Sequence, residues 1–236
     1  MTPKYKRILL KLSGETLGGE EGSGFDYETI ISLAENVIAV HNLDVEVGIV
    51  IGGGNIFRGS KPTAGNIGRV AGDHMGMLAT VINSICLQEM LEQRGVLTRV
   101  LSAIELNAIA EPYIKRRADR HLEKKRVVIF AAGTGNPYFT TDTAAVLRAS
   151  EVGAEIVIKA TKTNGVYDKD PLTHSDAVRY VKLNYDEVLN KNLQVMDATA
   201  IAFCRDNKLP IMVLDYREKD TILKAVCGES VGTLIK

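Results

Sequence analysis

The sequence predicts an α/β protein, a three-layer α/β/α sandwich built on a mostly parallel open sheet. Short apolar runs rich in β-branched residues alternate with helical patterns along the 236 residues. Three of these runs end in turns that are rich in glycine or hydroxyl side chains. Since 45% of the residues are hydrophobic, the chain can bury a large core. We therefore expect a single domain over residues 1–236, with two lobes that meet near residue 160.

The first half of the chain predicts strands at residues 6–12, 45–51, 96–101 and 126–131. After the first strand, Asp26 is a suitable N-cap for a helix with an apolar stripe. A long helix is expected at 73–94, and it ends at Gly95, which favours the left-handed conformation that closes helices. A basic helix is expected to begin at Pro112 and to run through Lys125.

The second half begins with a helical pattern at 143–152, which Gly153 closes before a strand at 155–160. Residues 161–176 then form a long polar segment with two turn signals. A loop of this length in a compact domain is usually functional or mobile. Further helices are expected at 185–189, 197–207 and 219–226, and further strands at 211–214 and 232–235.

Composition excludes several classes of partner. Lysine plus arginine equals aspartate plus glutamate at 29 each, so no overall field attracts nucleic acid or an anionic membrane. No apolar stretch reaches the roughly 18 residues of a membrane span, and the N-terminus lacks a signal-peptide pattern. We expect a cytoplasmic protein. The cysteines and histidines do not cluster at ligand spacing, so no metal ligand is assigned to the protein.

The most informative segment is Gly133-Thr-Gly-Asn-Pro-Tyr-Phe-Thr-Thr-Asp142, between a strand and a helix. Such a turn offers backbone N–H groups, hydroxyls and a positive helix end to an anion. Two similar turns follow earlier strands, at Ser13-Gly14 and at residues 52–55. Because the carboxyl ends of parallel strands lie on one edge of a sheet, the three turns can converge. The sequence therefore predicts a site for a phosphate ester at this edge.

Familiar motifs of other enzymes are missing. There is no G-x-x-x-x-G-K-[ST], which excludes a P-loop enzyme. The dinucleotide motif G-x-G-x-x-G fails because Tyr138 stands where the third glycine is needed. No G-x-S-x-G turn is present, which disfavours a hydrolase of that class.

Three charged residues allow more than one interpretation. Lys11, at the end of the first strand, could extend its charge to solvent, or it could stabilise a transferred phosphoryl group. Asp142 and Asp73 could each be a helix cap or a binding residue. Position alone leaves these alternatives open.

Taken together, the motifs resemble the uridylate kinase branch of the amino acid kinase family, over residues 6–235. The Asp-His-Met-Gly segment and the segment from Gly133 to Asp142 are specific to that branch. The motifs that carry the resemblance are Lys11-Leu-Ser-Gly-Glu15, Gly52-Gly-Gly-Asn-Ile-Phe-Arg-Gly59, Gly72-Asp-His-Met-Gly-Met77, Gly133 to Asp142, and Asp168 to Pro171.

The resemblance implies transfer of the γ-phosphoryl group of ATP to UMP, giving UDP in pyrimidine nucleotide synthesis. The acceptor lobe would lie at about 1–160 and the ATP lobe at about 161–236. Expected catalytic residues are Lys11, Asp142, Arg58 and Lys159, with Asp142 orienting the catalytic lysine. The residues expected to bind ATP are Lys11, Leu12, Ser13, Gly14, Gly54, Arg58, Thr161, Tyr167 and Asp170. Those expected to bind UMP are Gly53, Asp73, Thr134, Gly135, Asn136, Pro137, Tyr138, Phe139, Thr140 and Thr141.

The resemblance also implies partners and regulation. Mg²⁺ is expected to arrive with ATP, and the family is typically a homohexamer, often activated by GTP and inhibited by UTP. The family's effector loop would fall on Gly19, Glu20, Glu21, Gly22, Ser23 and Gly24, although these residues also suit a flexible hairpin turn. The alternatives are a carbamate, acetylglutamate or aspartate kinase of the same family, or a non-catalytic nucleotide-sensing regulator.

Overall fold

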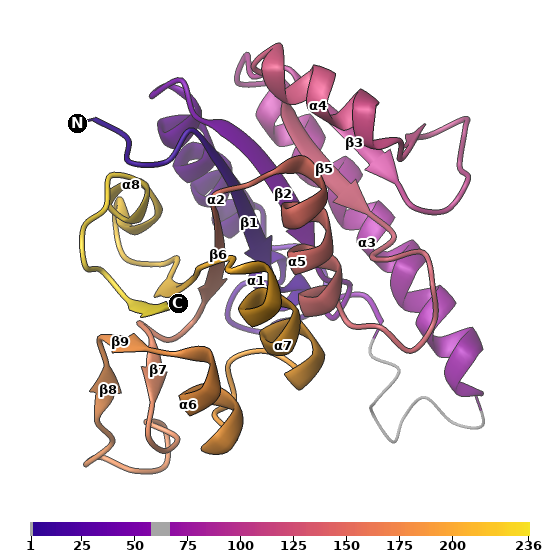
Figure 1. Cartoon of the computed structure of the whole chain (residues 1–236). Coiled ribbons are helices and arrows are strands. Elements are labelled where there is room, and N and C mark those ends of the chain that lie inside the picture. The colour runs from indigo at the N-terminus through magenta and orange to yellow at the C-terminus, as the bar shows by residue number, and fades with distance from the viewer. Residues whose placement is uncertain (1, 58–66) are drawn as a thin grey trace.

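The computed structural model describes residues 2–57 and 67–236, and its centre is a sheet between two layers of helices (Figure 1). Across the described residues, nine strands form this sheet in the order β4-β3-β5-β2-β1-β6-β10-β11-β9. Every neighbouring pair is parallel except β10 with β11. The strands are β1 Arg7–Leu12, β2 Glu46–Ile51, β3 Thr98–Ser102, β4 Glu111–Pro112, β5 Val127–Ala131, β6 Ile156–Thr161, β9 Lys182–Leu183, β10 Ile211–Asp215 and β11 Thr233–Ile235.

The helices cover both faces of the sheet, as the sequence predicts for a three-layer fold (Figure 1). Helices α2, α3 and α8 share one hydrophobic cluster with the sheet, and α4, α5, α6 and α7 share the other. The bounds are α1 Gly14–Leu17, α2 Tyr27–His41, α3 Arg69–Glu92, α4 Lys115–Glu123, α5 Thr141–Val152, α6 Tyr185–Asn190, α7 Ala198–Asn207 and α8 Thr221–Val226.

Alternation along β1 decides which side chains enter which layer. Ile8 and Leu10 pack in the cluster with α2, α3 and α8, whereas Leu9 packs in the cluster with α5. Successive side chains of a strand point to opposite faces, so Lys11 lies on the same face as Leu9. A charged side chain at the end of this buried strand is thereby directed toward α5.

Two predicted helices begin at clearly different residues in the structure. Helix α3 begins at Arg69, four residues earlier than predicted, so Asp73 lies inside the helix and is not its cap. Pro112 does not start a helix, because it belongs to β4, where it pairs with Ser102 of β3. Helix α4 begins at Lys115. Proline is compatible with this place because β4 is at the edge of the sheet.

The long polar segment after β6 is not structureless. It contains β7 Val166–Tyr167, which pairs antiparallel with β8 Arg179–Tyr180 in a small separate sheet. This hairpin projects beside α6 and β9 (Figure 1). Of the two turn signals, Asn164-Gly165 directly precedes β7, and Asp170-Pro171 lies between the two strands of the hairpin.

Helix α3 is long and apolar enough to cross a membrane, by length and composition alone. The expectation that no apolar stretch reaches the length of a membrane span therefore does not hold for α3. The apolar sequence of this helix is interrupted by the polar residues Asn83, Ser84 and Gln88. The inner face of the helix packs against β3 and β5. Its place in the fold is that of a core helix.

Candidate active site

Two lysines stand side by side at the carboxyl edge of the sheet. Lys11 of β1 and Lys159 of β6 are direct partners in the parallel register of these strands. Because residues paired in register point to the same face, both side chains emerge toward α5. Two positive charges at this spacing repel each other, so the arrangement requires a nearby negative charge.

Asp142, in the first turn of α5, supplies that charge. Its Oδ1 lies 2.7 Å from Nζ of Lys11, and its Oδ2 lies 3.0 Å from Nζ of Lys159. The three side chains are only 10–16% exposed. The N-cap of α5 is Thr140, whose hydroxyl accepts from the backbone N–H groups of Asp142 and Thr143, so Asp142 is not needed as the cap.

The electrostatics keep this carboxylate ionised. Burial opposes ionisation, but the charges of Lys11 and Lys159 outweigh it and lower the pKa of Asp142. Burial, together with the charge of Lys11, lowers the pKa of Lys159. Lys159 also donates to the carbonyl of Val195, which joins the group to the segment before α7. An ionised Asp142 between two ammonium groups orients them and is a poor proton acceptor.

The glycine turns after β1 and β2 pack directly against each other. A Cβ added to Gly14 would lie 2.4 Å from the backbone nitrogen of Gly54 and 2.8 Å from the carbonyl oxygen of Gly52. Side chains are thus excluded by contact between the two backbones. The result is a surface of main-chain groups beside Lys11, which suits the oxygens of a phosphate.

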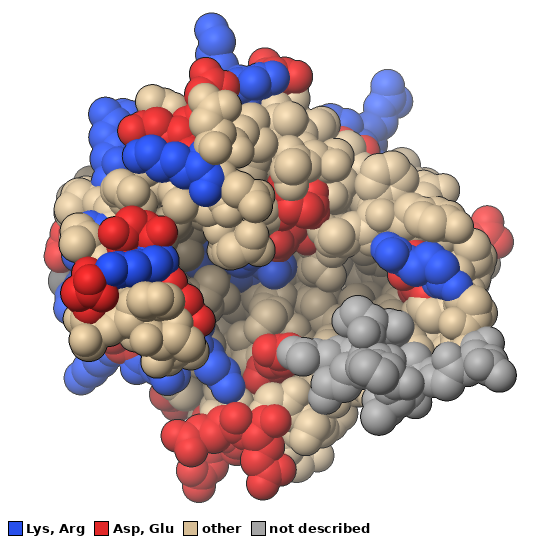
Figure 2. Space-filling view, turned by 90° about the horizontal axis from the view of Figure 1, so that it is seen from below, with Lys and Arg blue, Asp and Glu red and all other residues tan. Residues whose placement is uncertain are grey.

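A cavity of about 360 Å³ opens beside these glycines, between α3 and the segment that follows β5. Figure 2 looks onto this edge of the molecule and shows a hollow near the middle of the face. A cavity of this size is suited to a small organic ligand. Its lining includes Gly53, Gly54, Arg69, Asp73, Thr80, Thr134, Asn136, Phe139, Thr140 and Thr141.

Asp73 connects α3 to the far end of this segment. Its Oδ2 accepts from the backbone N–H of Tyr138 at 2.7 Å and from Nε of Arg69 at 2.8 Å. The pKa of Asp73 is lowered: burial opposes ionisation, and the Tyr138 N–H and Arg69 outweigh it. Residues 132–138 turn sharply, since Ala132, Gly133, Gly135 and Tyr138 all have positive φ. Because the family resemblance places the phosphoryl acceptor here, we call residues 132–141 the acceptor loop and the 360 Å³ cavity the acceptor cavity.

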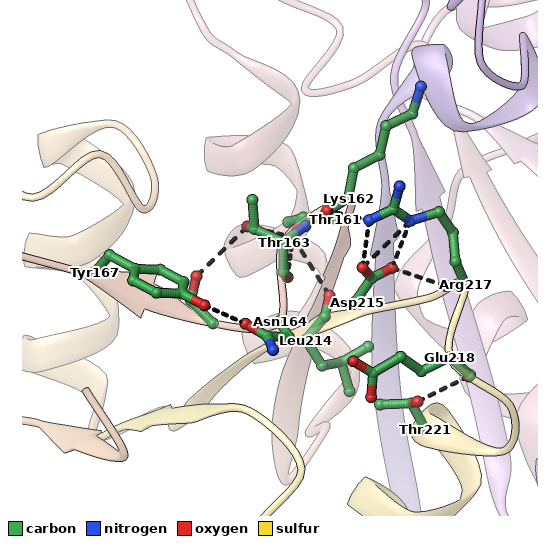
Figure 3. Close-up of polar contacts among 11 residues, drawn as sticks. Thr161, Lys162, Thr163, Asn164, Tyr167, Leu214, Asp215, Arg217, Glu218 and Thr221 are labelled. Carbon is green, nitrogen blue, oxygen red and sulfur yellow. Dashed lines mark hydrogen bonds and ion pairs between the residues drawn. The ribbon is translucent and has the colours of Figure 1, made fainter. Parts of the chain in front are cut away.

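A second cavity, of about 470 Å³, is lined in part by Lys159. Its lining includes Thr161, Tyr167 and Asp170, three of the residues expected to hold the adenosine part of ATP. Figure 3 shows the turn after β6, where Thr161 and Thr163 bond to each other and the Tyr167 hydroxyl donates to Asn164 at 2.6 Å. We call the cavity lined by Lys159 and Tyr167 the donor pocket.

Residues 6–215 match the model of the amino acid kinase family. The chain belongs to this family. Among solved structures, a UMP kinase from Bacillus anthracis is 41% identical, with a TM-score of 0.95 over 98% of this chain and 96% of that one. A UMP kinase from Ureaplasma parvum is 36% identical, with a TM-score of 0.92 over 99% of both chains. A uridylate kinase from Archaeoglobus fulgidus is 28% identical, with a TM-score of 0.75 over 97% of this chain and 99% of that one.

Twelve of the residues that the family resemblance assigns to the site line the two cavities, whereas Lys11, Ser13, Gly14 and Asp142 line neither. Arg58 lies outside the described residues. The Leu12 side chain is fully buried in the layer of α2, α3 and α8, so this residue can offer a ligand only its backbone. Gly135, Pro137 and Tyr138 belong to the acceptor loop without lining its cavity, and the Tyr138 side chain is 66% exposed.

The expected effector loop of this family member lies apart from both cavities. Residues 18–24 follow α1, and the carbonyl of Gly19 accepts from Nζ of Lys162 at 2.6 Å. A separate cavity of about 470 Å³ lies beside it, and its lining includes Glu20, Asp26 and Glu28.

Sequence reasoning missed several residues of the site. Arg69 could have been found, because it stands four residues before Asp73 at helical ion-pair spacing. Thr80 lines the acceptor cavity and shares a buried helix face with Asn83, where a polar residue is unexpected. Residues 193–195 line the donor pocket, and no local pattern indicates this, because only the packing of α7 brings them there.

Proposed function

We propose that this chain transfers the γ-phosphoryl group of ATP to UMP, producing UDP and ADP, as a step of pyrimidine nucleotide synthesis. The observation that carries the proposal is the cluster of Lys11, Asp142 and Lys159, which adjoins residues of two cavities. One cavity adjoins Thr140 and Thr141, the neighbours of Asp142, and the other begins at Lys159. The likeness to two UMP kinases at 41% and 36% identity supports the choice of substrates.

In the proposed reaction the acceptor oxygen of UMP attacks the γ-phosphorus in line with the leaving oxygen of ADP. Negative charge spreads over the equatorial oxygens in the transition state, and positioned cations stabilise it. Lys11 and Lys159 are the described cations at the junction of the cavities. Asp142 holds both ammonium groups in place, and its lowered pKa keeps it ionised throughout.

The acceptor loop and Asp73 fit the binding of a nucleoside monophosphate. A carboxylate accepts hydrogen bonds from ribose hydroxyls, and amide and backbone groups near Asn136 can pair with the edge of uracil. The backbone groups of Gly53 and Gly54 lie at the same cavity and can approach phosphate oxygens. The ring of Tyr167 in the donor pocket can cover the face of adenine.

Magnesium fits this site as a companion of ATP. When bound, it neutralises charge on the phosphate oxygens. Among the described residues, no group of three His, Cys, Asp or Glu side chains is arranged to hold a metal ion. We therefore expect phosphate and water oxygens to supply most of its ligands.

We also propose that the protein is a homohexamer. Helix α3 carries a stripe of exposed apolar side chains on its outer face, and large exposed apolar patches usually mark contacts between proteins. The stripe is formed by Met75, Leu78, Ile82 and Ile85, which are 39–47% exposed. The three cysteines are unpaired, and we place the reaction in the cytoplasm, where thiols stay reduced.

Regulation by nucleotides is proposed with one distinction. UTP carries the uracil and ribose of UMP, so it should compete for the acceptor cavity. GTP activation through residues 19–24 would have to overcome the acidic lining of the neighbouring cavity, where Arg217 is already bound to Asp215 at 2.6 Å. Initial rates with added UTP or GTP test both effects.

The decisive experiment is an acceptor screen with ATP and magnesium. UMP, carbamate, N-acetylglutamate and aspartate are offered separately, and ADP formation is measured. UMP alone should support turnover above the ATPase background. A different preferred acceptor would identify another kinase of the family, and binding of UMP and ATP without turnover would identify a nucleotide-sensing regulator. Lys11→Ala, carried through the same screen, controls for contaminating kinases.

A further inference from the structure

Three polar side chains are buried on the inner face of α3. Thr80 is 5% exposed, and Asn83 and Ser84 are fully buried. Burying a polar group costs free energy unless it is hydrogen-bonded, so the partners of these residues reveal what the helix gains from them. Ser84 donates only to the carbonyl of Thr80 in its own helix, at 2.7 Å. Thr80 and Asn83 instead reach out of the helix.

Thr80 holds the first residue of the acceptor loop. Its hydroxyl donates to the carbonyl of Met77 at 2.7 Å and accepts from the backbone N–H of Ala132 at 2.8 Å. Ala132 follows directly after β5 and has φ of 62°, a conformation that L-residues adopt at a cost. The bond from Thr80 therefore fixes the loop at the point where the chain leaves the sheet.

Asn83 holds the glycine turn after β2. Its Nδ2 donates to the carbonyl of Gly52 at 2.7 Å and to Oδ1 of Asn55 at 2.7 Å. Asn55 returns a bond of 3.1 Å to Oδ1 of Asn83 and also donates to the carbonyl of Gly24 at 2.8 Å. The two side-chain amides bond to each other, and Asn83 thereby bonds both Gly52 and Asn55, the two ends of the turn. All four N–H groups of the two amides are hydrogen-bonded.

The packing around this turn leaves little room for movement. A Cβ added to Gly53 would lie 2.8 Å from both Cβ of Ala79 and the carbonyl oxygen of Gly76, so α3 touches the turn directly. A Cβ added to Gly14 would lie 2.6 Å from Oδ1 of Asn55. The part of α3 from Gly76 to Asn83 thus contacts both the glycine turn and the acceptor loop.

We propose that Thr80 and Asn83 are positioning residues for phosphoryl transfer. Their side chains are three residues apart on one helix, and they set the separation between the acceptor loop and the glycine turn beside Lys11. The proposal rests on the proposed function for its kinetic consequences. Reacting atoms must meet at about 3–3.5 Å, and an error of about 1 Å from a change outside the reacting groups can cost about 10²-fold in rate.

The Thr80 bond is tested with an isosteric pair of variants. Thr80→Val removes the hydroxyl and keeps the volume, whereas Thr80→Ser keeps the hydroxyl. Thr80→Val should raise the KM for UMP roughly tenfold, since an unpaired buried N–H costs about 1–3 kcal/mol and 1.4 kcal/mol is tenfold. Thr80→Ser should stay within about threefold of the original KM, because the bond to Ala132 survives.

Ser84→Ala is the matched control, because it removes a buried hydroxyl from the same helix without touching either loop. Its KM for both substrates should equal that of the unchanged protein. Asn83→Ala should act through the glycine turn, lowering kcat and raising the KM for both ATP and UMP, because Gly54 is expected to bind ATP and Gly53 lines the acceptor cavity. If Asn83→Ala does not fold, the Thr80 variants decide the proposal on their own.

Hydrogen exchange provides a readout that does not depend on activity. The Ala132 amide should exchange faster in Thr80→Val than in the unchanged protein, and Thr80→Ser and Ser84→Ala should leave it protected. Unchanged exchange and unchanged KM in Thr80→Val would overturn the proposal, as would equal effects of Ser84→Ala. If the exchange pattern holds but the unchanged protein does not phosphorylate UMP, the proposed function fails and the anchoring role of Thr80 stands.

Discussion

At the scale of single residues, the arrangement of the site is determined by the charges of two lysines and one aspartate. Lys11 and Lys159 are neighbours across two strands, and each is at most 15% exposed. Two buried ammonium groups would be costly without Asp142, and Asp142 would be costly without them. The incoming phosphates of ATP add negative charge at the same place. The arrangement therefore keeps two cations in position before the substrate arrives.

Lys11→Ala should reduce kcat by about 10²–10³-fold with little change in UMP affinity, because removal of one preorganised charge-stabilising group costs about that much. Steady-state kinetics, with UMP affinity measured by calorimetry, checks this. Arg7→Ala is a suitable control, because Arg7 lies at the start of the same strand, remote from the site, and pairs with Glu46 and Asp119. A loss confined to UMP affinity would make Lys11 a binding residue.

Asp73→Asn should weaken UMP binding far more than ATP binding. The carboxylate loses its charge toward ribose hydroxyls, and its bond to the Tyr138 N–H becomes weaker, so both effects act on the acceptor cavity. Separate calorimetric titrations with each nucleotide measure the difference. Equal losses for UMP and ATP would point to a general role of Asp73 in the stability of α3.

The pH dependence of kcat should show the lowered pKa of Lys159. Burial and the charge of Lys11 favour its neutral form, so kcat should fall on the alkaline side at a pH below the ordinary lysine pKa of about 10.4. The same shift means that the unfolded chain binds this proton more tightly, so the contribution of Lys159 to stability rises as pH increases through its folded pKa. Lys159→Arg should move the alkaline fall in kcat to higher pH, because a guanidinium stays charged. An unmoved profile would assign the fall to another group.

At the scale of elements, α3 has two faces with different tasks. Its inner face holds Thr80 and Asn83 against the loops of the site, and its outer face is apolar and exposed. An exposed stripe of this kind is stabilised when a second apolar surface covers it. Contacts on the outer face would therefore act on the same helix that positions both loops.

A double change, Leu78→Glu with Ile82→Glu, should convert the assembly to smaller species. The charges would be buried without partners in any contact made by the stripe, which costs several kcal/mol. Light scattering after gel filtration gives the mass, and circular dichroism checks that each protomer stays folded. Leu172→Glu is the control, since Leu172 is 87% exposed and lies between β7 and β8, away from α3. An unchanged mass in the double variant would exclude the stripe as an interface.

The sequence predicted elements well where local chemistry decides them. Asp26 caps α2, and Gly153 closes α5 with φ of 67°, both as expected. The prediction was wrong where pairing with another strand determines the structure, as at Pro112, which pairs with Ser102 of β3. The junction of Lys11 and Lys159 depends on the pairing of β1 with β6, about 150 residues apart, and no local pattern indicates this register.

At the scale of the whole molecule, the two cavities divide the work of recognition. The donor pocket is formed by segments after β6, and the acceptor cavity by segments before α5. The expected division of the chain into two lobes near residue 160 remains a prediction. Specificity for the acceptor base should therefore depend on the residues that line the acceptor cavity.

UMP should be preferred over CMP by roughly tenfold to a hundredfold in kcat/KM. CMP presents a donor where UMP presents an acceptor, so a group of the acceptor loop would be left unpaired, and such mismatches cost about 1–3 kcal/mol. Competition between the two nucleotides in one reaction measures the ratio directly. Comparable use of CMP and UMP would contradict base reading by residues 134–141.

The central place of β1 has a consequence for synthesis on the ribosome. This first strand lies between β2 and β6, so it has a partner on one side as soon as residues 46–51 emerge and on the other only after residues 156–161. Until then the nascent chain carries an unpaired apolar edge, which is prone to aggregation. The strand that presents Lys11 is thus the first to be made but gains its second neighbour only when residues 156–161 emerge, so the pair of Lys11 and Lys159 is completed as that edge closes.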